Sequence, residues 1–158
     1  VNPLIPGEEE KTEKEPSKIL GLLEDNKIIP DYSMDMSALC TRVPVIDGHT
    51  ALVYLNFAEE VPDLDTIKKI WSEFEAEPQT LKLPSAPEPP ILIMEADDRP
   101  QVHLDVSNGA GMAVTIGRLA EDKFFDIRFV ALSHNTVRGA AGGAILTAEL
   151  LVEKGYVI

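Results

Sequence analysis

TRVPVIDGHTALVYL, residues 41–55, is the part of the chain from which the expected architecture follows. Two runs rich in β-branched and aromatic residues, 38–46 and 49–57, flank the dipeptide Asp47-Gly48. Asp-Gly between two such runs is a strong signal for a two-residue β-hairpin turn. The stretch therefore predicts a hairpin, and with it an antiparallel start to a sheet.

Alternation along this hairpin would place two chemically useful side chains on one face. If Ile46 pairs with His49, then Arg42 and His49 share a face and lie roughly 13 Å apart along the ladder, at about 3.3 Å per residue. The planar fork of arginine suits a carboxylate, and histidine transfers protons near neutral pH. The pair could therefore hold a small anion. An ordinary sheet with a surface arginine and a turn histidine explains the same spacing.

The rest of the chain predicts alternating helices and short strands. Residues 8–23 have a polar, helical pattern in which Pro16 would introduce a kink or begin a second helix. A second helix would be capped by Asp63 or Asp65, with four apolar side chains on one face: Ile67, Ile70, Trp71 and Phe74. Residues 83–91, LPSAPEPPI, are too rich in proline for a regular element and predict a rigid, extended loop.

Strands are expected at about 91–94, 111–119 and 124–132, followed by a helix from about 136 to 153 that ends before Gly155. The predicted buried stripe of this helix is Val137, Ala141, Ala144, Ala148 and Leu151. Together these elements predict one α/β (α+β) domain over residues 1–158, with a mixed, largely antiparallel sheet covered by helices.

Composition and charge exclude several classes of function. The chain has 27 Asp and Glu against 14 Lys and Arg, a net charge of −13, which disfavours a nucleic-acid partner because like charges repel. There is no run of 18 apolar residues and no signal-peptide pattern, so no membrane association is expected. The single Cys40 excludes an internal disulfide and fits a cytoplasmic protein. The three histidines show no metal-ligand spacing, so no metal is expected.

Three further groups are candidates for chemistry. Glu8 and Lys11 are neighbours on one helix face, although a solvated charged helix explains them equally. His134 and Asn135 precede a helix N-terminus that could contact an anion, or they belong to a capped and tightly packed helix. Cys40 has no adjacent base to lower its pKa, and we interpret it as a small packed residue.

Taken together and in order, the motifs of this chain resemble the carboxy-terminal half of aspartate-semialdehyde dehydrogenase, in its archaeal and fungal branch. The motifs that carry the resemblance are NPLIPGEEEKTEKEPSKILG, TRVPVIDGHT, LKLPSAPEPPI followed by DDRPQ, GMAVTIGR and HNTVRGAAGGAILTAELL. They span nearly the whole chain. The resemblance implies that residues 1–158 form a substrate-binding and dimerisation domain, within a homodimer or homotetramer.

The resemblance also implies roles for five residues. Arg42 would grip the substrate carboxylate, His49 would be the acid/base, and Glu8 and Lys11 would help to bind the substrate amino group and phosphate. Asn135 would lie beside the nicotinamide end of NADP. The implied reaction interconverts aspartyl phosphate plus NADPH with aspartate semialdehyde, NADP and phosphate, on the route to lysine, methionine and threonine.

The chain departs from the family pattern in one respect. The family's nucleophilic cysteine lies in an Asn-Cys-x-Thr stretch, which is absent from these residues together with the glycine-rich NADP loop, and Cys40 does not match that context. The chain also begins at Val1, without an initiator methionine. We therefore expect a fragment that is inactive alone. The alternatives are a malonyl-CoA or succinyl-CoA reductase domain, against which Glu8 favours an amino-acid substrate, and a non-catalytic dimerisation module.

Overall fold

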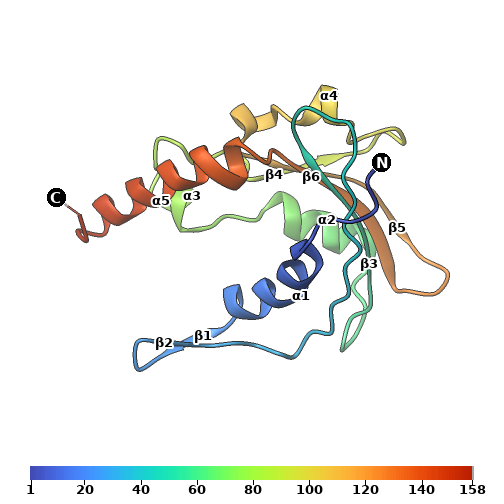
Figure 1. Cartoon of the computed structure of the whole chain (residues 1–158), viewed down its shortest axis with the longest axis horizontal. Coiled ribbons are helices and arrows are strands. Elements are labelled where there is room, and N and C mark those ends of the chain that lie inside the picture. Colours follow the sequence, from blue (N-terminus) through green and yellow to red (C-terminus); the bar gives the residue numbers. More distant parts are fainter. Residues whose placement is uncertain (158) are drawn as a thin grey trace. The chain divides into compact units, whose positions relative to one another are not determined.

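The structure is a computed structural model that describes residues 1–157. The chain divides into two compact units, of which unit 1 is Val1–Val45 and unit 2 begins at Ile46. Both are drawn in Figure 1, coloured along the sequence. The two units are described in turn.

Unit 1 is built on one exposed helix, α1, Glu8–Ile19. Gly7 precedes it with φ +79°, and Glu8, Glu9 and Glu10 fill its first turn, where carboxylates complement the helix dipole. Pro16 lies inside α1 and does not begin a second helix, contrary to one of the two predicted outcomes. The helix also ends at Ile19 rather than at residue 23.

A hairpin that the sequence pattern did not predict follows α1. Strands β1, Leu22–Glu24, and β2, Lys27–Ile29, pair antiparallel across Asp25-Asn26, whose φ values are 49° and 59°. Positive φ at both central residues is the geometry that two-residue hairpins favour, and Asn and Asp tolerate it. The run of leucines therefore belongs partly to a strand, and the prediction of one helix through residue 23 is wrong.

The predicted hairpin at Asp47-Gly48 is also wrong. Residues 38–46 form no strand, and Arg42 makes only an isolated antiparallel bridge with Asn2. Strand β3, His49–Leu55, instead pairs with β6, Ile127–Ser133. Pairing of β3 with β6 is more stable than a local hairpin, because β6 carries the deeply buried Ile127 and Leu132. Pro44 also lacks the N–H that a local ladder would need.

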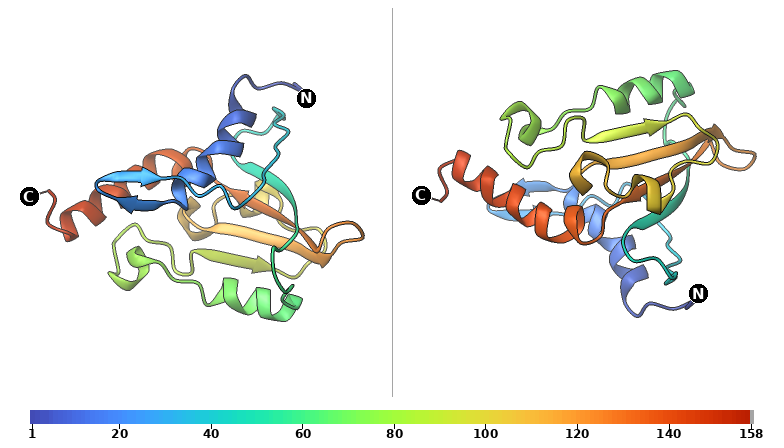
Figure 2. Two further views of the ribbon diagram at one scale, coloured as in Figure 1. Left: turned by 90° about the horizontal axis from the view of Figure 1, so that it is seen from below. Right: turned by 90° about the horizontal axis from the view of Figure 1, so that it is seen from above.

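Unit 2 contains a four-stranded mixed sheet in the order β3-β6-β5-β4 (Figure 2). Strand β5, Val114–Glu121, is antiparallel to β6, and β4, Ile91–Met94, is parallel to β5. Two of the three pairings are antiparallel, so the predicted fold class is confirmed. The later strands also lie close to their predicted positions.

Helix α2, Leu64–Ser72, packs on one face of this sheet. Its N-cap Asp63 accepts a hydrogen bond from the Thr66 nitrogen at 2.7 Å, which confirms the predicted cap. Ile67 is buried, and the ring of Trp71 lies 5.1 Å from that of Phe129 on β6 in an edge-on contact. Ile70 and Phe74 are exposed, so only part of the predicted apolar face is used.

The connections between strands carry short helices. Helix α3, Glu77–Thr80, precedes the proline-rich segment, which forms no regular element, as predicted. Helix α4, Val102–Asp105, and the 3-10 turn η1, Asn108–Gly111, join β4 to β5. Asp105 is 1% exposed, accepts two hydrogen bonds from the Arg99 guanidinium and one from the Gln101 nitrogen, and so fixes this connection.

The C-terminal helical segment starts as a π-helix, η2, Val137–Ala141, and continues as α5, Gly142–Glu153. Glu149 accepts hydrogen bonds from the backbone nitrogen and hydroxyl of Ser85, at 2.9 and 2.7 Å. No residue of α5 is buried, and four members of the predicted stripe, Ala141, Ala144, Ala148 and Leu151, are exposed. The predicted burial is therefore wrong for this chain, in which a polar contact anchors the helix.

Replacement of Asp105 by Asn tests the buried ion pair. The Arg99 hydrogen bonds hold the pKa of Asp105 below its usual range, so the pair stabilises the fold above the ordinary Asp pKa of about 3.9 and is lost as pH falls through the lower folded pKa. We expect Asp105→Asn to lower the free energy of unfolding in urea by about 2 kcal/mol at pH 7. The difference should shrink below about pH 3.9.

The matched control is Asp98→Asn, because Asp98 is exposed and its carboxylate accepts from the Gln101 side chain at 3.1 Å. Its unfolding free energy should stay close to that of the parent. Equal losses for both variants, or a loss at position 105 that does not change with pH, would contradict this account.

Candidate functional site

The three predicted substrate-binding residues all lie in unit 1. Glu8 and Lys11 occupy the first turn of α1, where the Lys11 Nζ donates to Glu8 Oε1 at 2.8 Å. This hydrogen bond raises the pKa of Lys11, so the ammonium stays charged. Arg42 is exposed, and its backbone nitrogen and oxygen each bond Asn2, at 2.9 Å.

Acidic side chains of α1 hold the segment that leads to Arg42. Glu9 Oε1 accepts from the Cys40 nitrogen at 3.0 Å, and Glu13 Oε1 accepts from the Ala38 nitrogen at 2.9 Å. The Cys40 sulfur lies 3.9 Å from the Thr12 hydroxyl and is half-buried, in agreement with its interpretation as a packed residue. The charged helix thus has a second use, because two carboxylates replace the missing strand partners of residues 38–40.

The predicted acid/base and cofactor residues lie in unit 2. His49 is the first residue of β3, is exposed, and pairs with Ser133 at the end of β6. Asn135 follows two residues after Ser133 and is half-buried. The β3–β6 register therefore brings the two regions of sequence, far apart along the chain, to the same end of the sheet.

Gly48 is a site residue whose place the hairpin prediction misjudged. It is buried with φ +102°, a conformation that L side chains rarely adopt. A Cβ here would lie 3.1 Å from Val102 Cγ1 and 3.3 Å from both Leu132 Cδ1 and Val106 Cγ2. Glycine is required next to His49 for both reasons.

Two polar contacts join residues 47–48 to residues 135–136. The Gly48 nitrogen donates to Asn135 Oδ1 at 2.8 Å. The Thr136 hydroxyl donates to Asp47 Oδ1 at 3.3 Å. Sequence patterns do not predict such tertiary contacts. Asp47-Gly48 indicates a turn and Asn135 is part of a predicted helix start, but nothing in the sequence pairs the two segments.

The helix N-terminus after Asn135 is not open to an anion. The His134 Nδ1 accepts from the backbone nitrogens of Thr136 and Val137, at 3.3 and 3.4 Å. The Gly139 nitrogen bonds the His134 carbonyl and the Ala141 nitrogen bonds the Thr136 carbonyl, both at 3.0 Å in the i to i+5 pattern. The capped, packed alternative is therefore the better interpretation of this segment.

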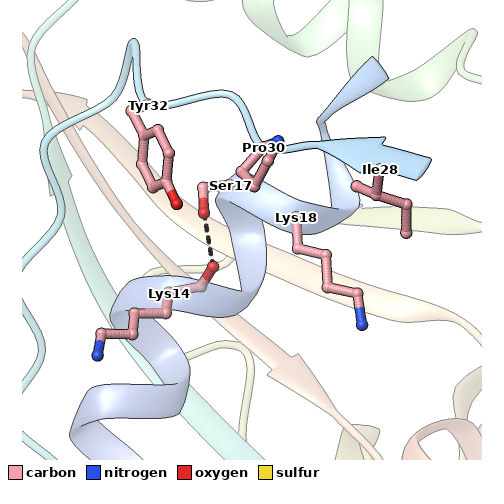
Figure 3. A pocket seen from close by; sticks show the side chains of 6 residues that line it. All are labelled: Lys14, Ser17, Lys18, Ile28, Pro30 and Tyr32. Atoms are coloured by element: carbon pink, nitrogen blue, oxygen red, sulfur yellow. Dashed lines mark hydrogen bonds between the residues drawn. The ribbon is translucent and has the colours of Figure 1, made fainter. Parts of the chain in front are cut away.

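Unit 1 also has a shallow pocket, which contains none of the predicted site residues. Lys14, Ser17, Lys18, Ile28, Pro30 and Tyr32 line it (Figure 3). Lys14 is paired with Glu10, and the Ser17 hydroxyl donates to the Lys14 carbonyl at 2.7 Å, so two of its polar groups are already engaged. Among residues 1–157 no group of His, Cys, Asp and Glu could hold a metal, and no helix has the length and apolar character to cross a bilayer.

Comparison with known proteins gives the family. The model of the semialdehyde dehydrogenase dimerisation domain matches residues 1–138. Aspartate-semialdehyde dehydrogenase of Methanothermobacter thermautotrophicus is 46% identical over 96% of this chain and 44% of its own length. The malonyl CoA reductase (NADP) of Metallosphaera sedula is 46% identical over 98% of this chain and 44% of its own length.

The fold comparison agrees. The crystal structure of aspartate semialdehyde dehydrogenase with NADP from Candida albicans has a TM-score of 0.90 and 42% identity, over 99% of this chain and 45% of that chain. The chain belongs to the semialdehyde dehydrogenase family and matches its dimerisation domain. It spans less than half the length of the relatives it matches.

Replacement of Gly48 by Ala should destabilise unit 2, because the side chain adds both backbone strain and close contacts. We expect a loss of about 1–3 kcal/mol in the free energy of unfolding. The control is Gly155→Ala, at a residue with φ +73° and no atom within 4 Å of a new Cβ, which should lose about 1 kcal/mol from strain alone. Urea unfolding measures both, and equal losses would show that packing around Gly48 contributes nothing.

Proposed function

We propose that this chain is the substrate-binding and dimerisation part of an NADP-dependent aspartate-semialdehyde dehydrogenase. The complete enzyme interconverts aspartyl phosphate and NADPH with aspartate semialdehyde, NADP and phosphate. The observation that carries the proposal is the match over nearly the whole chain to enzymes of that name, at 46% identity and a TM-score of 0.90. This chain alone is expected to be inactive, because the nucleophilic cysteine and the glycine-rich loop are not among its residues.

Each unit supplies a different part of the chemistry. In unit 1, Arg42 binds the substrate carboxylate through its fork, while Glu8 and Lys11 bind the amino group and the phosphate. The negative charge of Glu8 suits the substrate ammonium, and the positive charge of Lys11 suits the phosphate. In unit 2, His49 accepts and donates the protons of the reaction at the exposed start of β3.

NADP use rests on the relatives. The Candida structure is of the enzyme with NADP, and the Metallosphaera enzyme is a malonyl CoA reductase (NADP). Bound NADPH supplies the hydride that reduces the acyl group. The residues of this chain do not make a nucleotide site by themselves, since they include no glycine-rich phosphate loop; Asn135 is the only residue we assign beside the nicotinamide.

Reduction of malonyl-CoA is the second candidate function. The observation that favours it is the Metallosphaera enzyme, whose identity to this chain equals that of the Methanothermobacter dehydrogenase. The Glu8–Lys11 pair supports the first candidate, because Glu8 suits a substrate ammonium and Lys11 a phosphate, and an acyl-CoA such as malonyl-CoA has no ammonium.

We propose that the complete enzyme pairs through the exposed face of β3. Leu52 is 73% exposed and Tyr54 is 52% exposed, although both lie in a regular strand of the sheet. An apolar sheet face left open in a single chain is a common interface between copies. The family's description as a dimerisation domain supports this assignment.

The acid/base role is tested in the complete enzyme by replacing His49 with Ala. We expect kcat to fall by about 10²–10⁴, the usual contribution of a positioned acid/base, with a smaller change in KM. The control is His103→Ala, at an exposed histidine of α4, which should keep parental kcat. Equal activity of both variants would rule out His49 as the proton-transfer residue.

The carboxylate role of Arg42 is tested by Arg42→Ala and Arg42→Lys. Loss of a charge-assisted hydrogen-bond pair, at about 1.5–3 kcal/mol per bond, should lower kcat/KM for aspartate semialdehyde by 10-fold or more. Lysine keeps the charge but not the fork, so it should restore only part of the loss. Parental kcat/KM in Arg42→Ala would remove this residue from the site.

The interface is tested by Leu52→Asp in the complete enzyme. A carboxylate at the centre of an apolar contact should dissociate the dimer, and the molar mass from light scattering should halve. Val61→Asp, a change at another exposed apolar residue outside the sheet, should leave the mass unchanged. An unchanged mass for Leu52→Asp would place the interface elsewhere.

A further inference from the structure

We propose that Asn135 is a positioning residue for His49, acting through the backbone of Gly48. The juxtaposition that carries the proposal is the Asn135 Oδ1, 2.8 Å from the Gly48 nitrogen across 87 residues of sequence. The proposal rests on the proposed function, since it concerns the proton transfer assigned to His49. It adds a second role to the proposed place of Asn135 beside the nicotinamide, because the amide oxygen acts on the backbone before His49.

The position of the His49 side chain is set by the backbone on either side of it. It is the first residue of β3 and is exposed, and its side chain has no hydrogen-bond partner among residues 1–157. The backbone pairing with Ser133 fixes His49 from one side of the strand. The peptide between Gly48 and His49 then sets the direction in which the chain enters β3.

Gly48 is held on two sides. Val102, Val106 and Leu132 pack where its side chain would be, within 3.3 Å of a Cβ. On its nitrogen, Asn135 supplies the acceptor that a buried N–H needs. Loss of that acceptor would leave the N–H unsatisfied and favour a local shift of the peptide that carries His49.

Asn135 is itself fixed to the strand that pairs with His49. It follows two residues after Ser133, and its neighbour Thr136 holds Asp47 through a hydroxyl bond at 3.3 Å. The His134 Nδ1 caps the next helical turn and stiffens the same segment. The residues before β3 and the residues after β6 are therefore joined by side-chain bonds as well as by the ladder.

The two ends of the Asn135 amide separate positioning from cofactor binding. The Oδ1 accepts from Gly48, whereas the Nδ2 is the end that could donate to a nicotinamide carboxamide. Asp keeps the acceptor and loses the donor, and Ala loses both. The two substitutions therefore distinguish the two roles.

The experiment uses the complete enzyme with Asn135→Ala, Asn135→Asp and a control, Asn56→Ala. Asn56 Oδ1 accepts from the Asp126 nitrogen at 3.0 Å, a similar bond at the other end of β3 and roughly 23 Å from His49 at about 3.3 Å per residue. Turnover is measured with aspartate semialdehyde, phosphate and NADP at the optimum pH of each variant. Hydrogen exchange of the peptide covering residues 43–52 is followed by mass spectrometry.

Asn135→Ala should lower kcat by about 10- to 100-fold, the cost of misplacing a catalytic group by about an ångström, with little change in the KM for NADP. Asn135→Asp should restore most of kcat. Exchange in residues 43–52 should be faster in the Ala variant and close to parental in the Asp variant. Asn56→Ala should keep parental kcat.

Three results would overturn the proposal. They are parental kcat in Asn135→Ala, a fall in both Asn135 variants with a raised KM for NADP, and an equal fall in Asn56→Ala. An inactive parent enzyme would overturn the proposed function itself. The exchange data would then still report whether Asn135 holds Gly48, so the two failures are distinguishable.

Discussion

The antiparallel pairing of β3 with β6 is the constraint on which unit 2 depends. It joins residues 49–55 to residues 127–133, and the buried Ile127 and Leu132 on β6 give it a core to cover. Because strand side chains alternate with a period of two, Ile127 and Leu132 lie on opposite faces of the sheet, and a slip of β6 by one residue would move each of them to the wrong face. The same register places His49 opposite Ser133 and brings Asn135 to the Gly48 nitrogen. Packing and the candidate site are thus fixed by one alignment.

Unit 1 shows a different solution to the same need for backbone partners. Residues 38–46 are predicted as a strand but form no ladder, and carboxylates of α1 take the place of strand carbonyls at Ala38 and Cys40. A single bridge to Asn2 holds Arg42. The acidic helix is therefore structural at Glu9 and Glu13, and its first turn carries the pair proposed to bind substrate, Glu8 and Lys11.

The sequence predicted the later part of the fold better than the earlier part. The strands at 91–94 and 124–132, the Asp63 cap and the proline-rich loop follow from local rules and are confirmed. The hairpin at Asp47-Gly48 failed because a turn signal is local, whereas the partner of β3 lies more than 70 residues away. The prediction that α5 has a buried stripe is wrong, because an apolar pattern does not show which element, if any, packs against the helix. The family followed from motif order, but the contact of Gly48 with Asn135 required the structure.

The most direct test is to determine which acyl acceptor, phosphate or CoA, the complete enzyme uses. NADPH formation from aspartate semialdehyde and NADP should be followed with phosphate, with CoA and with neither. We expect NADPH to form only with phosphate, since the reaction ends in aspartyl phosphate. Formation that requires CoA, or none under any condition, would contradict the assignment of this chain to an aspartate-semialdehyde dehydrogenase.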